Sequence, residues 1–378
     1  MRIAYFTHSL LSCWNHGNAH FLRGVLSELQ RRGHAVRALE PQDNWSLSNL
    51  LADHGTQGLA AFSEAYPRLK SQFYPPDTES EALIGDADLV IVHEWNEPEL
   101  VARIGALRAR GGRFTLLFHD THHRAVSDPE AIRAFDLSGY DGVLAFGEAL
   151  SEVYRRWGWG SRVWTWHEAA DLHLFHPPAI ETERQGLVWI GNWGDGERTA
   201  ELERYLFRPA ANAGFSLDVY GVRYPDEALA MLRRHHVRFH GWAPNARVPE
   251  IFAGALATVH VPRRYYATIL PGIPTIRMFE ALACGIPLVS APWSDSEGLF
   301  RSGRDYLVAR DGAAMMRHLE ALASDPELRA SLAASGLETI RSRHSCAHRV
   351  DELLAIVAHI ETPLPQQGAS DEDRLLRV

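Results

Sequence analysis

The sequence predicts an α/β protein in which two doubly wound domains face each other across a cleft. Short apolar runs of strand length alternate with segments of helical period along most of the chain. This alternation is interrupted at a proline pair and a polar stretch near residue 178, and it then starts afresh. The length of 378 residues fits two or three domains of ordinary size.

The first predicted domain covers residues 1–178. It opens with a βαβ unit of a parallel sheet, made of a strand, a polar loop, a helix and a second strand at residues 3–6, 12–18, 19–32 and 35–39. The same pattern predicts strands at 87–93, 114–118 and 142–146 and helices at 99–110 and 150–157. Polar residues follow these strands, and in open α/β sheets ligands bind at the carboxyl ends of the strands.

The second predicted domain covers residues 179–350. Its expected strands are residues 187–190, 216–220, 237–240, 257–261, 287–290 and 306–308, and its expected helices include 198–207, 275–284 and those that begin at 312 and 326. A terminal helix at 351–362 is expected to cross back to the first domain. Residues 363–378 are expected to form a mobile tail.

Composition and charge exclude several classes of protein. Apolar residues at 46% and charged residues at 22% are typical of a folded globular chain and not of a disordered one. A net charge of −9 argues against nucleic acid as the main partner and against adsorption to an anionic membrane by charge alone, but peripheral membrane contact stays open. No apolar run reaches the length of a membrane span, and the first residues turn polar too early for a signal peptide, so we expect a cytoplasmic protein.

Cysteine and lysine usage narrows the chemistry further. The three cysteines lie far apart, which fits neither a disulfide framework nor a zinc motif. Of the 38 basic residues, Lys70 is the single lysine and the other 37 are arginines. We therefore expect any phosphate group to be bound by arginine or by backbone amides, and a P-loop, which needs a lysine, is excluded.

The strongest local signal is the stretch 271–287, where a Pro/Gly turn leads into a helix. The free N–H groups at the start of such a helix, at Thr275, form an anion site, and Arg277 in the first turn would add positive charge. Glu280 follows one turn later among apolar residues, where its carboxylate can accept hydrogen bonds from two vicinal hydroxyls of a ribose. The alternative is that Glu280 is simply an acid favoured by the helix dipole.

The run from residue 277 to 287 resembles the donor-binding segment of glycosyltransferases with two Rossmann-like domains, the GT-B architecture. It is most similar to the CgeB-like group and the larger retaining group 4 families. Residues 166–177, 187–192 and 237–242 resemble further segments of these enzymes in the same order. The resemblance implies transfer of a sugar from a nucleotide-sugar donor to an unidentified acceptor (a glycan, a lipid-linked compound, a protein or a small molecule), with retention of configuration and without a metal or other cofactor.

The resemblance also implies roles for individual residues. Glu280 would hold the ribose of the donor, and Arg198 would hold its diphosphate, with Arg263 and Arg264 as rivals. Gly191 and Asn192 would form the glycine turn after the first donor-domain strand, and His240 and Trp242 would lie near the base. The larger families carry two glutamates eight residues apart; Glu280 matches the second, but the first, which contacts the transferred sugar, is replaced by Gly272, so the identity of the sugar and the activity itself stay open.

His119 and Asp120 follow a predicted strand of the first domain. In related enzymes a histidine at such a place contacts the transferred sugar, and Asp120 is a candidate general base of an inverting reaction. A structural loop is the second interpretation. The third is a metal site of a hydrolase, because His119, Asp120, His122 and His123 are all metal-ligand types.

The acceptor is expected on the amino-terminal side of the cleft. His16 and Gly17 form the first strand-to-helix turn, and Glu94 follows another predicted strand. The predicted function is thus a cytoplasmic, metal-independent glycosyltransferase. Three alternatives stay open: a catalytically silent nucleotide- or carbohydrate-binding protein, a metal-dependent hydrolase built on residues 119–123, and a nucleotide-sugar epimerase.

Overall fold

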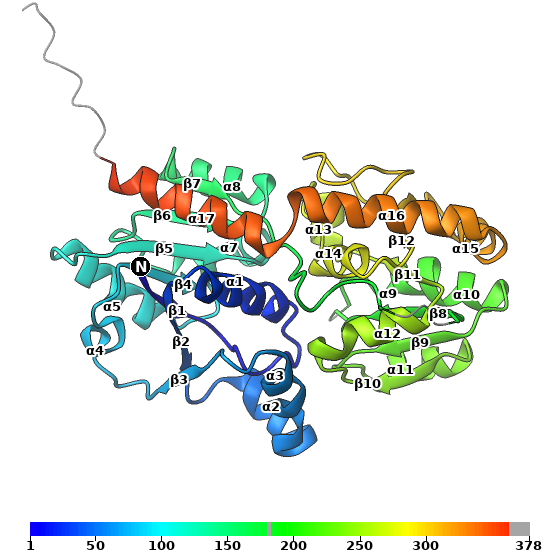
Figure 1. Ribbon diagram of the computed structural model, residues 1–378, viewed down its shortest axis with the longest axis horizontal. Helices are drawn as coiled ribbons and strands as arrows, with labels where there is room; N and C mark the ends of the chain where they lie inside the picture. The colour runs from blue at the N-terminus through cyan, green and yellow to red at the C-terminus, as the bar shows by residue number, and fades with distance from the viewer. Residues whose placement is uncertain (180–182, 195, 363–378) are drawn as a thin grey trace, which may run out of the picture.

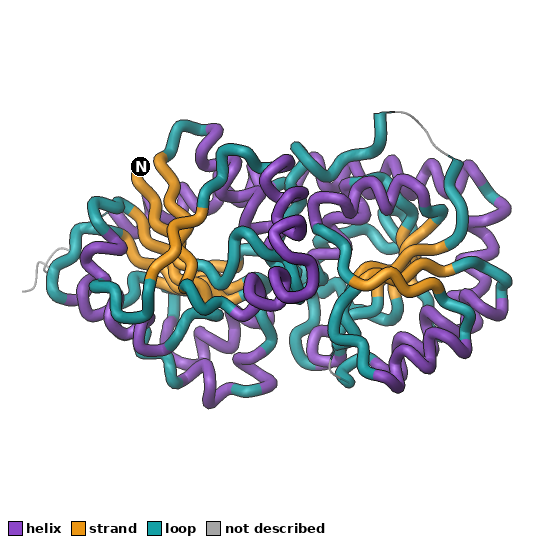
Figure 2. Tube along the Cα trace, turned by 90° about the horizontal axis from the view of Figure 1, so that it is seen from below, coloured by secondary structure: helices purple, strands orange, loops and turns teal. Residues whose placement is uncertain are grey.

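The computed structural model describes residues 1–179, 183–194 and 196–362. Figure 1 shows two α/β domains lying side by side, and Figure 2 shows helices on both faces of each sheet. Parallel sheets need this double cover, because their strands are apolar on both faces. The predicted fold class, two doubly wound domains, is therefore confirmed.

The amino-terminal domain is built on a sheet of seven parallel strands in the order β3-β2-β1-β4-β5-β6-β7. The strands are β1 (Arg2–Phe6), β2 (Ala35–Pro41), β3 (Ser71–Tyr74), β4 (Leu89–His93), β5 (Thr115–Asp120), β6 (Gly142–Ala145) and β7 (Val163–Thr165). Phe6 is in register with Val92, and His93 with His119. The carboxyl ends of β1, β4 and β5 therefore meet at one edge of the sheet.

Helices of very different length cover this sheet. They are α1 (Ala19–Arg31), α2 (Trp45–His54), η1 (Gly55–Leu59), α3 (Ala60–Ala65), α4 (Ser80–Ile84), α5 (Pro98–Ala109), α6 (Arg124–Ser127), α7 (Pro129–Arg133), α8 (Glu148–Tyr154) and η2 (Arg155–Trp159). The apolar stripe of α1, which includes Phe21, Val25 and Leu29, is buried in one core with Ile3 and Tyr5 of β1. This is the packing that the spacing predicts for the first βαβ unit.

The carboxyl-terminal domain has a sheet of six parallel strands in the order β10-β9-β8-β11-β12-β13. The strands are β8 (Leu187–Ile190), β9 (Leu217–Tyr220), β10 (Arg238–Gly241), β11 (Ala257–His260), β12 (Leu288–Ser290) and β13 (Leu307–Val308). Its helices are α9 (Thr199–Leu202), η3 (Glu203–Phe207), α10 (Arg208–Asn212), α11 (Asp226–Arg234), η4 (Asn245–Arg247), α12 (Val248–Gly254), α13 (Arg264–Thr268), α14 (Ile276–Ala283), α15 (Gly312–Ser324) and α16 (Pro326–Arg343).

The last helix, α17 (Cys346–Glu361), lies over the amino-terminal domain, whereas α16 lies on the other domain (Figure 1). The indole N–H of Trp166 donates to the carbonyl of Arg349 at 2.9 Å, and Arg32 at the end of α1 donates to the carbonyl of Ala347 at 3.0 Å. The expected tail at 363–378 lies outside the described residues. None of the described helices is long and apolar enough to cross a membrane.

The two domains are also joined by a segment that packs across the boundary. Tyr266 of α13, Leu270 and Ile273 are buried in the apolar core of the amino-terminal domain. Glu297 reaches the same domain from another loop, where its Oε1 accepts a hydrogen bond from the backbone N–H of Glu148 at 2.9 Å. The structure therefore shows the domains in close contact on this side of the cleft.

Candidate active site

A cleft of about 590 Å³ lies where the carboxyl ends of the two sheets face each other. Its walls come from the loops after β1, β4 and β5 on one side and after β8, β9 and β10 on the other, together with the start of α14. This is the edge at which open α/β sheets bind ligands. Of the predicted site residues, those that line it are His16, Gly17, Gly191, Asn192, Arg198, Trp242, Arg263, Thr275 and Arg277.

Arg198 is the most unusual cation of the cleft. It is 9% exposed, and its guanidinium donates to the carbonyl oxygens of Val261 at 3.2 Å and Asn192 at 2.5 Å. Its Nε has no partner, and no described carboxylate forms an ion pair with it. Burial, reinforced by the charge of Arg263, lowers the pKa of Arg198 to about 10, so that it stays charged at neutral pH. Its guanidinium also lies over the ring of Trp189 at 5.1 Å, and a buried cation without a counter-ion favours an anionic ligand.

Two further arginines and a helix end surround Arg198. Arg263 forms an ion pair with Glu197 at 3.1 Å, and Arg277 forms one with Glu280. Both arginines line the cleft, as does Thr275, which precedes α14 without capping it through its side chain. The free N–H groups of the first turn of α14 therefore add to the positive potential.

Glu280, the predicted ribose ligand, is placed behind the cleft wall. It is fully buried and is absent from the cleft lining. Its Oε1 accepts a hydrogen bond from Asn245 Nδ2 at 2.7 Å and lies 3.1 Å from His20 Nδ1. Burial favours the neutral acid, but Arg277, His20 and Asn245 together outweigh it and hold the pKa of Glu280 below its ordinary value. In this conformation the carboxylate reaches the cleft only through Arg277 and Asn245, which do line it.

His119 and Asp120 are the two residues that the sequence predicts to contact substrate. Both are fully buried beneath the cleft and neither lines it. His119 Nδ1 lies 2.5 Å from the hydroxyl of Tyr5, and Asp120 Oδ2 accepts a hydrogen bond from the hydroxyl of Tyr154 at 2.7 Å. Because β5 continues to Asp120, the turn that follows brings Thr121 and His122 to the cleft in their place.

Glu94 is placed in the same way. Its carboxylate accepts hydrogen bonds from Thr121 Oγ1 at 3.1 Å and Arg124 Nη2 at 2.9 Å, and the side chain is fully buried. Burial, and then the nearby Asp120, raise the pKa of Glu94 to about 8. Its neighbour Trp95 lines the cleft instead.

Of the two residues predicted to lie near the base, Trp242 lines the cleft and His240 does not. Trp242 lines the cleft, its indole N–H is buried without a partner, and its ring lies 4.7 Å from that of His54 in the other domain. His240 is outside the lining, because it pairs with Asp218 at 2.6 Å on the surface. The ring against which His240 stacks, Tyr220, lines the cleft.

Gly272, which stands where the larger families have an acid, is also outside the lining. Its φ is 87°, and a Cβ there would lie 2.8 Å from Cγ of Glu297 and 2.9 Å from its Oε1. The carboxylate of Glu297 is already engaged by Glu148 and by His167 Nε2 at 2.8 Å. The Cβ would also lie 2.7 Å from Ser296 Oγ, so the glycine leaves room for a loop whose Glu297 contacts the other domain.

Glu168 is a site residue that the sequence did not reveal. It lines the cleft, is 6% exposed and accepts a hydrogen bond from Asn18 Nδ2 at 3.1 Å. Burial raises its pKa to about 8, so it carries a proton at neutral pH. Its position shortly after a strand is the feature that would have identified it. That strand, β7, has only three residues and was not predicted.

The histidines of residues 119–123 do not converge on one point. His119 faces the core, His122 lines the cleft, and His123 stacks on Tyr265 at 4.7 Å and pairs with Glu197 at 3.3 Å. Among residues 1–179, 183–194 and 196–362, no group of three His, Cys, Asp or Glu side chains is arranged to hold a metal ion.

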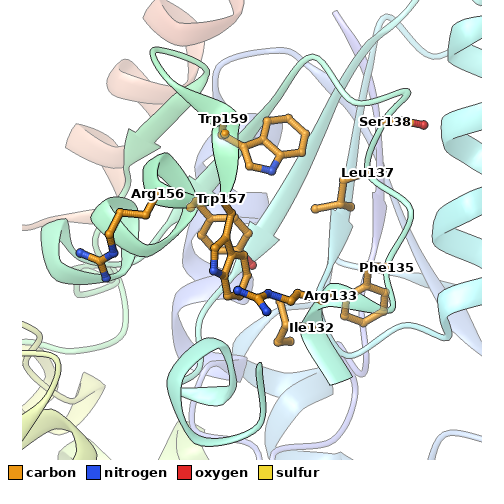
Figure 3. Close-up of a pocket in the computed structure, with 10 residues that line it drawn as sticks. Ile132, Arg133, Phe135, Leu137, Ser138, Arg156, Trp157 and Trp159 are labelled. Atoms are coloured by element: carbon orange, nitrogen blue, oxygen red, sulfur yellow. The ribbon is translucent and has the colours of Figure 1, made fainter. Parts of the chain in front are cut away.

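A second pocket, of about 640 Å³, lies on the flank of the amino-terminal domain (Figure 3). Trp157 and Trp159 of η2 face Phe135 and Leu137 across it, and Arg133 lies over the ring of Trp157 at 5.0 Å. No described carboxylate lines this pocket, whose polar side chains are those of Arg133, Ser138, Tyr154 and Arg156. The cleft between the sheets is therefore the stronger candidate for chemistry.

Comparisons with known proteins agree with this geometry. A family model described as glycosyl transferase-like matches residues 198–355, and no curated protein matches the chain. HepE from Anabaena, solved with UDP and glucose, is 14% identical with a TM-score of 0.66 over 95% of this chain and 99% of its own. S. aureus TarM, solved with UDP, is 11% identical with a TM-score of 0.66, and the match covers 94% of this chain and 99% of TarM. Sucrose-phosphate synthase from Thermosynechococcus elongatus is 13% identical with a TM-score of 0.63 over 95% and 99%, so the predicted GT-B fold is confirmed.

Proposed function

We propose that this chain, a glycosyltransferase of the GT-B fold, moves a sugar from a uridine diphosphate sugar to an acceptor held by its amino-terminal domain. The observation that carries the proposal is Arg198, a buried and unpaired cation in the cleft between the sheets. The proposal of uridine as the base is supported by HepE and TarM, which were both solved with UDP.

The diphosphate is proposed to lie between Arg198 and the start of α14. Arg198 offers a free Nε, Arg277 and Arg263 add charge, and the first turn of α14 offers backbone N–H groups. Negative charge develops on the diphosphate as the bond to the sugar breaks, and fixed donors at that place stabilise the transition state. We propose that these groups suffice without a metal ion.

The nucleoside is proposed to lie against Trp242 and Tyr220. The unpartnered indole N–H of Trp242 can donate to a base or ribose oxygen, and the ring of Tyr220 offers an apolar face. Glu280 would reach the ribose only if Arg277 turned from it toward the diphosphate. Retention of configuration is our proposal for the stereochemical course, on the resemblance to retaining families.

The acid Glu168 is proposed to face the transferred sugar. It lies beside Asn18 at the start of α1 and lines the cleft together with Thr275 and Arg277 at the start of α14. As a neutral carboxyl it can both donate and accept a hydrogen bond, which suits a sugar hydroxyl.

The test is titration calorimetry with UDP and with uridine. Arg198→Met keeps the bulk and removes the charge, so UDP affinity should fall about 10- to 100-fold while uridine affinity stays within about twofold. Arg204→Met, an exposed arginine in the next helical turn, is the matched control. Unchanged UDP affinity in Arg198→Met would refute the assignment. UDP binding without UDP release from any UDP-sugar and acceptor would identify the silent binding protein.

A further inference from the structure

Charge is divided unequally between the two walls of the cleft. The carboxyl-terminal wall carries Arg198, Arg223, Arg263, Arg277 and Glu197. Among the described lining residues of the amino-terminal domain, the single ionisable acid is Glu168, whose pKa burial raises to about 8, and there is no aspartate, lysine or arginine. A donor diphosphate therefore has its cations on one side only, and the opposite side is electrically neutral.

The neutral side is an aromatic wall, made of His8, His16, Trp45, Trp95 and His122. The ring of His8 lies 4.8 Å from Trp45 and 5.4 Å from His16. The ring of Trp95 lies 5.3 Å from His122. Four separate loops or helix starts supply these rings, so the fold gathers them at one place.

Two polar atoms of the aromatic wall lack a partner. His8 is 4% exposed, and its Nε2 is buried without a hydrogen bond, as is Nδ1 of His122. Burial lowers the pKa of His8 to about 4, so the ring is neutral at pH 7. A neutral imidazole can donate or accept one hydrogen bond at each nitrogen, and a buried nitrogen without a partner is costly.

The nearest cation behind the wall, Arg124, does not line the cleft and is held by Trp95 and Glu94. The guanidinium of Arg124 lies 4.1 Å from the centre of the Trp95 ring and donates to Glu94 Oε2 at 2.9 Å. Because Arg124 lies behind the lining residues, a phosphate or carboxylate on the acceptor would meet no cation at this wall of the cleft itself. An uncharged sugar would meet aromatic faces for its C–H bonds and imidazole nitrogens for its hydroxyls.

We infer that the aromatic wall binds a neutral sugar ring of the acceptor, with a hydroxyl of that ring bonded to Nε2 of His8. This inference rests on the proposed function, because it takes the opposite wall to hold the donor diphosphate. It assigns the acceptor of this enzyme to uncharged carbohydrates, and it makes Trp45 and His8 determinants of acceptor specificity.

The experiment is saturation-transfer NMR on the protein loaded with UDP, with methyl β-glucoside, N-acetylglucosamine, glucose 6-phosphate and glucuronate as probes. The neutral sugars should give signals about fivefold or more above those of the charged ones. Trp45→Leu, at a residue 37% exposed, should remove most of that signal without changing UDP affinity. Trp159→Leu, in the flank pocket of Figure 3, is the matched control and should keep it.

Each other outcome has a definite meaning. Equal or stronger signals from the charged sugars, no signal from any sugar, or an unchanged signal in Trp45→Leu would overturn the acceptor assignment and leave the donor proposal standing. Failure of UDP to bind the wild-type protein would instead refute the proposed function. His8→Leu is the second variant, and it should lose the neutral-sugar signal as Trp45→Leu does.

Discussion

At the scale of single residues, the acid Glu168 makes stability depend on pH. An unfolded glutamate ionises near its ordinary pKa of 4.5, whereas burial in the cleft raises the folded pKa to about 8. Between these values unfolding releases a proton, so stability falls as pH rises. Glu168→Gln removes this penalty and should raise Tm relative to wild type at pH 8, by about 2–4 °C for each 1 kcal/mol gained, with little difference at pH 5.

Differential scanning calorimetry across that range measures the effect. Glu99→Gln, at an exposed acid near the start of α5, should show no such trend. A Tm difference for Glu168→Gln that is the same at both pH values would contradict the buried, protonated state.

The sequence predicts which loops carry polar residues, but it does not predict which side chain of each loop points into the cleft. His16, Asn192, Arg198 and Trp242 follow strands or loops at the expected edge, and the structure brings them to the cleft. Glu94 and Asp120 follow the same rule and yet are buried, while their neighbours Trp95 and Thr121 line the cleft. The backbone conformation of each turn decides which of two adjacent residues points into the cleft. This conformation has no repeating pattern in the sequence from which it could be predicted.

At the scale of elements, the turn before α14 is held by a close contact. A methyl group on Gly272 would meet the side chains of Ser296 and Glu297, and its φ of 87° disfavours any other residue. Gly272→Ala should therefore destabilise the protein by about 2–4 kcal/mol, which combines backbone strain with overpacking. Urea unfolding measures this change.

The control is Gly303→Ala. That glycine has a similar φ of 80° but open space around the added methyl group, so only the backbone cost of about 1–2 kcal/mol should remain. Equal destabilisation by the two substitutions would show that the contacts with Ser296 and Glu297 are unimportant.

The long elements were predictable, and the short ones were not. The strands from β4 to β6 and the helix α1 lie within a few residues of their predicted ranges, because their apolar periods are long and regular. No element was predicted between residues 40 and 86, where the structure has α2 to α4 and β3. These helices are short, and β3 is an edge strand with exposed Gln72 and Phe73, so neither gives a clear period.

At the scale of the whole molecule, the packing of one domain into the other sets the width of the cleft. Ile273 is fully buried in the core of the amino-terminal domain although it belongs to the loop before α14. Ile273→Ala should weaken this contact by about 2–4 kcal/mol and increase the radius of gyration in small-angle scattering. Leu319→Ala, in a core confined to the other domain, should cost as much without changing the dimensions. Equal dimensions for both variants would contradict this role of Ile273.

The central claim is that the cleft binds a nucleotide through its diphosphate, and thermal unfolding of the wild-type protein with UDP, UMP and uridine tests it most directly. UDP at 100 times its dissociation constant should stabilise the protein by about 2.7 kcal/mol, UMP at the same concentration by less and uridine by least. That order is predicted by the unpaired charge of Arg198 and the open start of α14. Equal shifts with UDP and uridine, or no shift with UDP, would contradict the claim.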